Sequence, residues 1–252
     1  MKVFDVFNYN GEPVADFRTH LLSGVVHEHV VVEGTHTFTG ERKPVLYSHG
    51  LRRDITPLHY ITTDAVVPGD AWATEAAQRN APIPYLIEHA GDDDLILCSD
   101  ADEMINPDDI DAICGAVDAL GGAALILQDF YYYNLNWKKP TDWPNAFACR
   151  VGMLKRYTIQ EMRGRVPIGI KSGWHISYAE TRENIRRKIE SFAHTECNRP
   201  EFKTDEHLDR CLREGLDLFG RTDQHLIAVS DAGLPEPLRD FNHHIRMAQC
   251  GS

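Results

Sequence analysis

Residues 94–109 read DLILCSDADEMINPDD and carry the pattern that decides the fold. The apolar run Leu95–Cys98 is short and stands between acidic residues, which favours a buried strand. Asn106-Pro107-Asp108-Asp109 then supplies a cap residue, a proline suited to the first turn and carboxylates that complement a helix N-terminus. The stretch therefore predicts a strand, an acidic loop at its carboxyl end, and a helix that continues to about Leu120.

The rest of the chain alternates between strands and helices in the same way. We expect further strands at Val3–Phe7, Val25–Glu33, His59–Thr63 and Ala123–Leu127, the last extending into the aromatic run Phe130–Tyr133. We expect further helices from Val14, over Asp70–Ala81, over Thr181–His194 and over Glu206–Leu216. This order predicts an α/β fold with a mainly parallel central sheet and functional loops at the carboxyl ends of its strands. No repeat or Gly/Ser-rich linker divides residues 1–252, so a single domain is expected.

Composition excludes several classes of protein. The 252 residues carry a formal net charge of −12, which disfavours nucleic acid as a partner, and a hydrophobic fraction of 42%, which favours a packed globular protein. The six cysteines form no C-x-x-C pair, the amino terminus lacks the apolar run of a signal peptide, and no stretch is apolar enough to span a bilayer. We therefore expect a cytoplasmic protein with reduced thiols and no membrane span.

The loop Ser99-Asp100-Ala101-Asp102-Glu103 is the sharpest candidate site. Residues i and i+2 of an extended segment project to one side, so Asp100 and Asp102 could converge on one cation. Their hard oxygen ligands suit Mg²⁺ or Mn²⁺, which could neutralise a leaving diphosphate. A solvated loop that caps the following helix is the alternative. Met104 stands where a calcium hand needs an oxygen ligand, and it also disfavours a phosphatase with Asp100 as nucleophile.

Acidic residues are concentrated around this loop. They are Asp92, Asp93, Asp94, Asp100, Asp102, Glu103, Asp108 and Asp109. Bare carboxylates would repel a diphosphate, so the clustering predicts that a divalent cation must bind before a diphosphate can approach.

Histidine, aromatic and arginine side chains supply the remaining candidates. His175, in Gly173-Trp174-His175, could complete a carboxylate metal site or could serve packing alone. The stretch Tyr131–Trp137, with Trp143 soon after, is either an aromatic platform for a sugar or a strand of core tyrosines. Glycine-rich phosphate loops are absent, which leaves Arg79 and Arg221 as candidate phosphate partners or ordinary surface charges.

Several segments, taken in order, resemble glycosyltransferase family 17, the family of the β-1,4-mannosyl-glycoprotein 4-β-N-acetylglucosaminyltransferase. The likeness covers roughly residues 2–221. Its pieces are Val31-Val32-Glu33, Phe38-Thr39-Gly40 with Lys43-Pro44, Trp72 with Arg79, Ser99–Glu103, the aromatic run ending at Trp137, and Gly173-Trp174-His175-x-Ser177-Tyr178.

This resemblance implies a GT-A-type, Rossmann-like fold for nucleotide-diphospho-sugar transferases. The nucleotide-sugar half would span about residues 1–120, and the acceptor and metal-completing half about 121–252. It also implies an inverting, Mn²⁺- or Mg²⁺-dependent transfer, with UDP-GlcNAc as donor and a glycan or glycoconjugate as acceptor. The animal enzymes are membrane-anchored Golgi proteins, so for this chain we expect a cytoplasmic relative that acts on another glycan or a lipid-linked sugar.

The resemblance also assigns roles to individual residues. Asp100 would face the ribose or the metal, Asp102 would bind the metal, and His175 would be the third ligand. Glu33 would lie near the nucleotide, and Arg79 near the base or the phosphates. An inverting transfer needs a carboxylate to accept the acceptor's proton, for which Glu183 is the first choice and Glu103 the competitor.

Two functions of other classes remain open. The chain could be a non-catalytic carbohydrate-binding module that uses the Tyr131–Trp137 surface. It could also be a metal-dependent phosphohydrolase with Asp100 as nucleophile.

Overall fold

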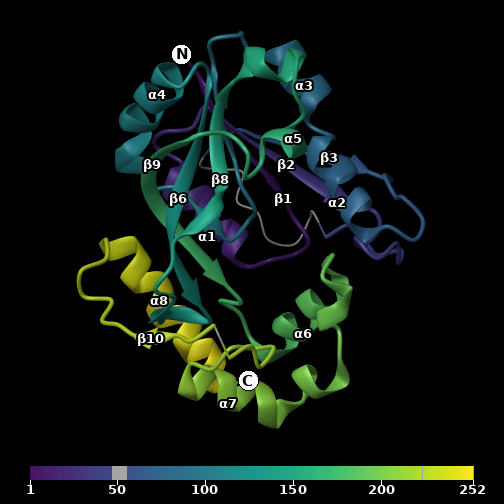
Figure 1. Ribbon diagram of the computed structural model, residues 1–252, viewed down its shortest axis with the longest axis vertical. Helices are drawn as coiled ribbons and strands as arrows, with labels where there is room; N and C mark the ends of the chain where they lie inside the picture. Colours follow the sequence, from purple (N-terminus) through teal and green to yellow (C-terminus); the bar gives the residue numbers. More distant parts are fainter. Residues whose placement is uncertain (47–55, 223, 252) are drawn as a thin grey trace.

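A ten-stranded mixed sheet forms the centre of the computed structural model, which describes residues 1–46, 56–222 and 224–251 (Figure 1). Its strands are β1 (Val3–Asn8), β2 (Glu28–Gly34), β3 (Leu58–Thr63), β4 (Leu95–Cys98), β5 (Glu103–Met104), β6 (Ala123–Tyr132), β7 (Asn134–Lys138), β8 (Trp143–Arg150), β9 (Ile168–Ser177) and β10 (Ile227–Ala228). The helices are α1 (Val14–Leu22), α2 (Ala71–Asn80), α3 (Ile83–His89), α4 (Ile110–Ala119), α5 (Ile159–Met162), α6 (Arg182–Ser191), α7 (Asp205–Glu214) and α8 (Glu236–Gly251). Short 3₁₀ turns lie at Pro107–Asp109, Val151–Lys155, Thr195–Cys197 and Pro200–Lys203.

The sheet is parallel in one part and mostly antiparallel in the other. Strands β3, β2, β1 and β4 are neighbours in that order. They run parallel, which confirms the predicted strand direction for this part of the sheet. Strand β8 then pairs antiparallel with both β4 and β6, and β7 also pairs antiparallel with β6. Strand β9, by contrast, pairs parallel with β6. The expectation of a mainly parallel sheet is therefore wrong for residues beyond 120, where β7 and β8 each pair antiparallel with β6 and no helix separates these three strands.

Alternating side chains of the central strands pack into two hydrophobic cores, one on each face of the sheet. On β4, Ile96 and Cys98 pack with residues of α3 and α5 on one face of the sheet. Leu95 and Leu97 pack with residues of α4 on the other face. Figure 1 shows α4 on one side of the sheet and α3 with α5 on the other. Burial on both faces explains why the strand is a continuous apolar run.

The parallel strands end at one edge of the sheet. β1 ends at Asn8, β2 at Gly34 and β4 at Cys98, and the register pairs Val6 of β1 with Cys98 of β4. Beyond this region lie α6, α7 and α8, in the lower part of Figure 1. Loops that follow neighbouring parallel strands meet at such an edge, which is where ligands bind in open α/β sheets.

The short pairing of β5 with β9 brings the GWH segment to the acidic loop. Glu103 lies opposite His175, and Met104 lies opposite Trp174. Gly173 has a φ of +82°, and a Cβ built there would lie 2.0 Å from the Met104 carbonyl oxygen. Only glycine permits this conformation and this close approach together. The glycine therefore allows β9 to pair closely with β5, which places His175 beside Asp102.

The helices and strands expected from apolar patterning are found, with changes at their ends. The strand expected at Val25–Glu33 begins at Glu28, and the helix expected over Thr181–His194 occupies Arg182–Ser191. Among the described residues, no helix is long and apolar enough to cross a lipid bilayer.

Candidate active site

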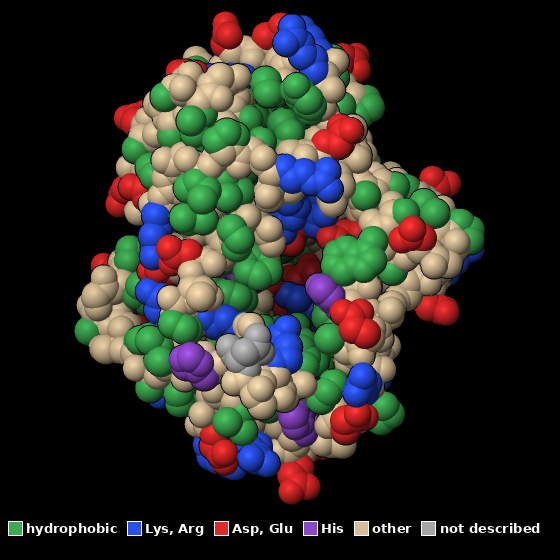
Figure 2. Space-filling model, viewed as in Figure 1, with side chains coloured by type: hydrophobic (Ala, Val, Ile, Leu, Met, Phe, Trp, Pro, Cys, Tyr) green, Lys and Arg blue, Asp and Glu red, His purple; other side chains and the backbone are tan. Residues whose placement is uncertain are grey.

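A cavity of about 780 Å³ opens at the carboxyl ends of β1, β2, β4 and β9. Figure 2 shows this face hollowed near its middle, with acidic and basic side chains inside the hollow. Each of these strands contributes the residues at or just after its end, among them Asn8, Gly34, Asp100 and Ser177. The cavity therefore lies where the parallel part of the sheet predicts a binding site.

Asp100 faces two arginines. Its Oδ1 lies 3.0 Å from Arg79 Nη2, and its Oδ2 lies 2.5 Å from Arg163 Nη2. Burial alone would raise the pKa of Asp100, but the guanidinium groups of Arg163 and Arg79 hold that pKa well below its usual range. Asp100 is therefore ionised, and both of its oxygens are already bonded to arginine.

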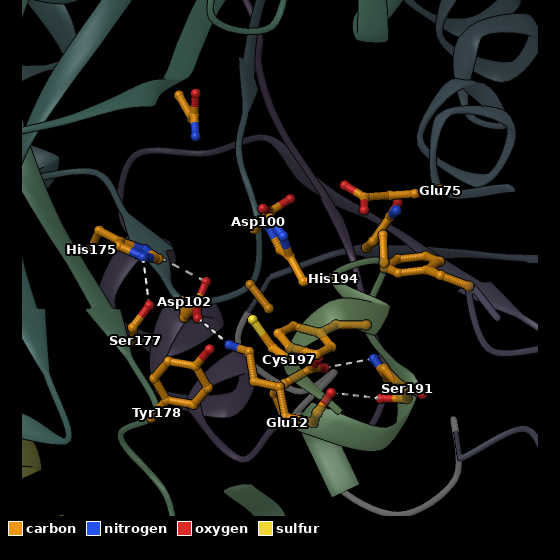
Figure 3. Close-up of a pocket in the computed structure, with 18 of the residues that line it drawn as sticks. Glu12, Glu75, Asp100, Asp102, His175, Ser177, Tyr178, Ser191, His194 and Cys197 are labelled. Carbon is orange, nitrogen blue, oxygen red and sulfur yellow. Dashed lines mark hydrogen bonds and ion pairs between the residues drawn. The ribbon is translucent and has the colours of Figure 1, made fainter. Parts of the chain in front are cut away.

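Asp102 and His175 form a second pair on the cavity wall (Figure 3). Asp102 Oδ2 lies 2.5 Å from Lys188 Nζ, and its Oδ1 lies 3.7 Å from His175 Nδ1. The other ring nitrogen, Nε2, is 2.7 Å from the Ser177 hydroxyl. Burial lowers the pKa of His175, which keeps the imidazole neutral near pH 7. His175 Nδ1 is buried and has no hydrogen-bond partner among the described residues.

These two side chains fit part of a cation site. A neutral imidazole with an unpartnered nitrogen beside a carboxylate oxygen is a suitable donor pair for Mn²⁺ or Mg²⁺. Within the described ranges, no group of three or more His, Cys, Asp or Glu side chains could hold a metal ion. Ions of this kind are commonly held by one or two protein ligands together with substrate phosphates. The residues present therefore fit a cation that a bound diphosphate also coordinates.

The acidic loop is not electrostatically bare. Arg79 and Arg163 neutralise Asp100, and Lys188 neutralises Asp102. The premise that these carboxylates are bare is therefore wrong, because the fold supplies cations from distant segments. The need for a divalent ion stays a prediction.

Glu103 supports the loop and does not face the cavity. Its side chain is fully buried, with Oε1 2.6 Å from Trp143 Nε1 and 2.7 Å from Arg163 Nη2. Its Oε2 accepts the backbone N–H of Asp100 at 2.8 Å. These bonds fix the loop and leave neither oxygen available to a substrate.

Glu33 is also fully buried, next to the cavity. It pairs with Lys43 at 2.6 Å and accepts the backbone N–H of Leu46 at 2.8 Å and the Tyr60 hydroxyl. Lys43, and not Glu33, lines the cavity. Glu33 thus orients the ammonium group of Lys43 beyond the end of β2, in the region where the sequence-based assignment places the nucleotide.

Arg79 and Arg221 both line the cavity. Arg79 also pairs with Glu75 at 2.5 Å across one turn of α2. Arg221 is held by Asp217 at 2.7 Å and by the Tyr132 hydroxyl at 3.2 Å. Both guanidinium groups are therefore preset at the wall, as anion-binding residues need to be.

Glu183 lies apart from these residues. It is exposed in the first turn of α6 and is not among the residues that line the cavity. The structure thus brings Asp100, Asp102 and His175 together and places the carboxylate first chosen as base outside the cavity.

The stretch Tyr131–Trp137 is mostly core. Tyr131, Tyr133 and Leu135 are buried, and the indole N–H of Trp137 donates to the Leu212 carbonyl at 3.1 Å. Only Tyr132 of this stretch lines the cavity. Of the two alternatives for this stretch, the strand of core tyrosines is therefore confirmed.

Other aromatic residues line the cavity. Trp143 stacks on the His175 ring with centroids 4.4 Å apart, and Phe130 packs against both. Trp72, which is 52% exposed, contacts the His194 ring edge-on at 4.7 Å. The cavity thus combines charged groups with apolar faces that suit sugar rings.

The charged residues at this site that sequence patterns alone did not reveal include Arg163, Lys188 and Glu12. Lys188 does carry a local signal, because it stands three residues after Ile185 on the buried face of an amphipathic helix. Glu12 follows directly on the turn that closes the first strand. Arg163 follows a four-residue helix and carries no such pattern.

Comparison with known proteins gives the family. The comparison with curated protein sequences found no match. A solved structure titled 4-diphosphocytidyl-2C-methyl-D-erythritol synthase, from Anaerococcus prevotii, aligns with a TM-score of 0.40 and 8% identity, covering 68% of this chain and 89% of that one. The family model of glycosyltransferase family 17 matches residues 1–225. The chain therefore belongs to glycosyltransferase family 17 and is a glycosyltransferase.

Proposed function

We propose that this enzyme moves a sugar from a UDP-sugar, with UDP-GlcNAc as the first donor to test, to a hydroxyl of a glycan or glycoconjugate. The observation that carries the proposal is the Asp102–His175 pair in a cavity that Arg79, Arg163, Lys188 and Arg221 also line. A diphosphate needs cationic partners, and its ion needs oxygen or nitrogen ligands. Three of the four parallel strands, β1, β2 and β4, end at the cavity, which supports a GT-A-type fold for this reaction.

Asp102 Oδ1 and His175 Nδ1 would hold a Mn²⁺ or Mg²⁺ ion together with the diphosphate. When bound, such an ion supplies Lewis-acid stabilisation of the negative charge on the leaving diphosphate. Lys188 adds an ammonium group on the other oxygen of Asp102. Ser177 fixes the ring of His175 through Nε2, which keeps Nδ1 directed at Asp102.

In the proposed transfer, side chains of the cavity stabilise the leaving group and orient the sugar rings. The acceptor hydroxyl attacks the anomeric carbon as the bond to the diphosphate oxygen breaks, which inverts that carbon. Arginine and lysine groups on the cavity wall stabilise the charge that develops on the leaving group. The aromatic faces of Trp143 and Trp72 would orient sugar rings. The acceptor, the cytoplasmic location and the absence of a nucleic-acid partner stay predictions.

The other two functions find less support. A carbohydrate-binding module would need the Tyr131–Trp137 surface, most of which is buried. A phosphohydrolase would need Asp100 as a free nucleophile, but both of its oxygens contact guanidinium groups. Both observations therefore argue against these two functions.

Titration calorimetry of UDP, with and without Mn²⁺, tests the proposal. We expect Mn²⁺ to tighten UDP binding, and Asp102→Ala to remove most of that gain. Asp108→Ala is the matched control, because Asp108 is an exposed aspartate six residues along the chain and lies outside the cavity. A screen of UDP-sugars for UDP release then identifies the donor. If the unaltered protein binds UDP neither with nor without Mn²⁺, the proposal is wrong.

A further inference from the structure

Glu12 differs from the other acidic residues that line the cavity. Four of the others form ion pairs: Glu75 with Arg79, Asp100 with Arg79 and Arg163, Asp102 with Lys188, and Asp142 with Lys171. The fifth, Glu196, is hydrogen-bonded to the His194 ring at 2.8 Å. Glu12 has no such partner within 4.0 Å among the residues that the structure describes. It is therefore the cavity carboxylate whose charge is not already committed to a neighbour.

The loop that carries Glu12 is fixed against α6. Glu12 Oε2 accepts the backbone N–H of Asn10 at 2.6 Å, and Asn10 Nδ2 donates to the Ser191 hydroxyl at 3.0 Å. Arg187 Nη2 donates to the carbonyl oxygen of Gly11 at 3.0 Å. Figure 3 shows Glu12 and Ser191 in the same pocket as Asp102. Glu12 is thus held in place through one oxygen, and no hydrogen bond engages its Oε1 in the described structure.

The surroundings of Glu12 tune its protonation. Burial raises the pKa of Glu12, and the charge of Asp102 adds to this, while Lys188 opposes it. The charged and titratable groups that face Glu12 are Tyr9, Asp102, Glu180, Arg187 and Lys188. Burial and the charge of Glu12 raise the pKa of Glu180 to about 8, so Glu180 keeps its proton at neutral pH.

We propose that Glu12 is the general base of the transfer reaction. The inference rests on the proposed function, because it names the residue that activates the acceptor of a UDP-sugar. The Glu12 carboxylate takes the proton of the acceptor hydroxyl as that oxygen bonds to the anomeric carbon. The electron pair of the broken bond leaves with the diphosphate, and the protonated Glu12 afterwards returns its proton to water.

The two carboxylates named from the sequence fit this role less well. Glu103 is fully buried, and both of its carboxylate oxygens accept hydrogen bonds from Trp143, Arg163 and the backbone of the loop. Glu183 is exposed and lies outside the cavity. A general base must come within hydrogen-bond reach of the proton that it removes, which Glu12 can do from the cavity wall.

The test measures UDP release from UDP-GlcNAc, with water as acceptor, beside calorimetric binding of UDP. For Glu12→Gln we expect UDP release to fall by about 10²–10⁴-fold, the usual contribution of a general base, with UDP affinity kept within about twofold. In the unaltered enzyme we expect release to rise with pH through the raised pKa of Glu12, and Glu12→Gln should lose this rise. Glu201→Gln, an exposed glutamate on another segment, is the control.

Three results would overturn the inference alone: full UDP release by Glu12→Gln, loss of UDP affinity in that variant, or an equal loss of release in Glu183→Gln or Glu180→Gln. Each would move the base elsewhere or make Glu12 a donor-binding residue. Failure of the unaltered protein to bind UDP is a different result, which overturns the proposed function together with this inference.

Discussion

The guanidinium group of Arg18 donates a hydrogen bond of 2.7 Å to the carbonyl oxygen of Asp100 and so fixes the backbone of the acidic loop. The same group bonds the carbonyl oxygen of Glu103 at 2.9 Å and the Ser99 hydroxyl at 2.7 Å. Its charge is balanced by Asp5 on β1, at 2.5 Å, and both side chains are fully buried. The position of the cavity carboxylates thus depends on an ion pair that no substrate can reach.

Arg18→Met should destabilise the protein by about 3–5 kcal/mol, because it leaves the buried Asp5 carboxylate without its main partner. Urea unfolding followed by circular dichroism measures the change. Arg210→Met is the control, since Arg210 pairs with Glu214 on the surface and should contribute less than about 1 kcal/mol. Equal stability of the two variants would contradict the role given to Arg18.

Gly173→Ala should destabilise the fold and weaken UDP binding together. The new Cβ would meet the Met104 carbonyl oxygen, and its backbone would be held at a φ that alanine disfavours. We expect a loss of at least about 2 kcal/mol in the free energy of unfolding, since backbone strain of this kind costs about 1–3 kcal/mol before the clash is added.

Gly115→Ala is the matched control for that substitution. Gly115 lies within α4, and a Cβ there would meet nothing within 4 Å. Alanine favours the helix by up to about 1 kcal/mol, so this variant should be at least as stable as the parent. A neutral Gly173→Ala variant would show that the β5–β9 pairing does not need the glycine.

Glu180→Gln should change how stability depends on pH. The pKa of Glu180 is raised to about 8 in the folded state, chiefly by burial, and its buried Oε2 has no hydrogen-bond partner in the part of the chain that the structure describes. The folded protein therefore holds a proton that the unfolded chain releases near pH 4.5, so wild-type stability falls as pH rises from there toward 8. The stability of the variant relative to the parent should grow by about 3 kcal/mol between pH 5 and pH 8.

Urea unfolding of both proteins at pH 5, 6, 7 and 8 measures this difference. The value at a single pH also includes the hydrogen bonds that the amide gains or loses, so the change with pH is the informative quantity. A constant difference across the series would mean that Glu180 titrates normally in the folded protein.

Local sequence signals predicted the parallel strands and the acidic loop, and non-local contacts determined the rest of the site. The runs around Val6 and Ile96 are apolar because both faces of these strands are buried, a property that is readable in the sequence. The partners of Asp100 and Asp102 are not readable in this way. Arg163 lies 63 residues from Asp100, and Lys188 lies 86 residues from Asp102. Only the folded chain shows that these carboxylates are neutralised.

Lys188→Met tests whether the protein supplies its own cation to the diphosphate. The Lys188 ammonium group lies 2.5 Å from Asp102 at the cavity wall, and its removal leaves that buried carboxylate uncompensated. In EDTA we expect UDP affinity to fall at least about tenfold, which corresponds to about 1.4 kcal/mol. With Mn²⁺ the loss should be smaller, because the ion then neutralises Asp102. Lys155→Met, at an exposed ion pair with Asp92, should change neither value. Equal losses with and without Mn²⁺ would mean that Lys188 and the ion act independently, and no loss in EDTA would exclude Lys188 from diphosphate binding.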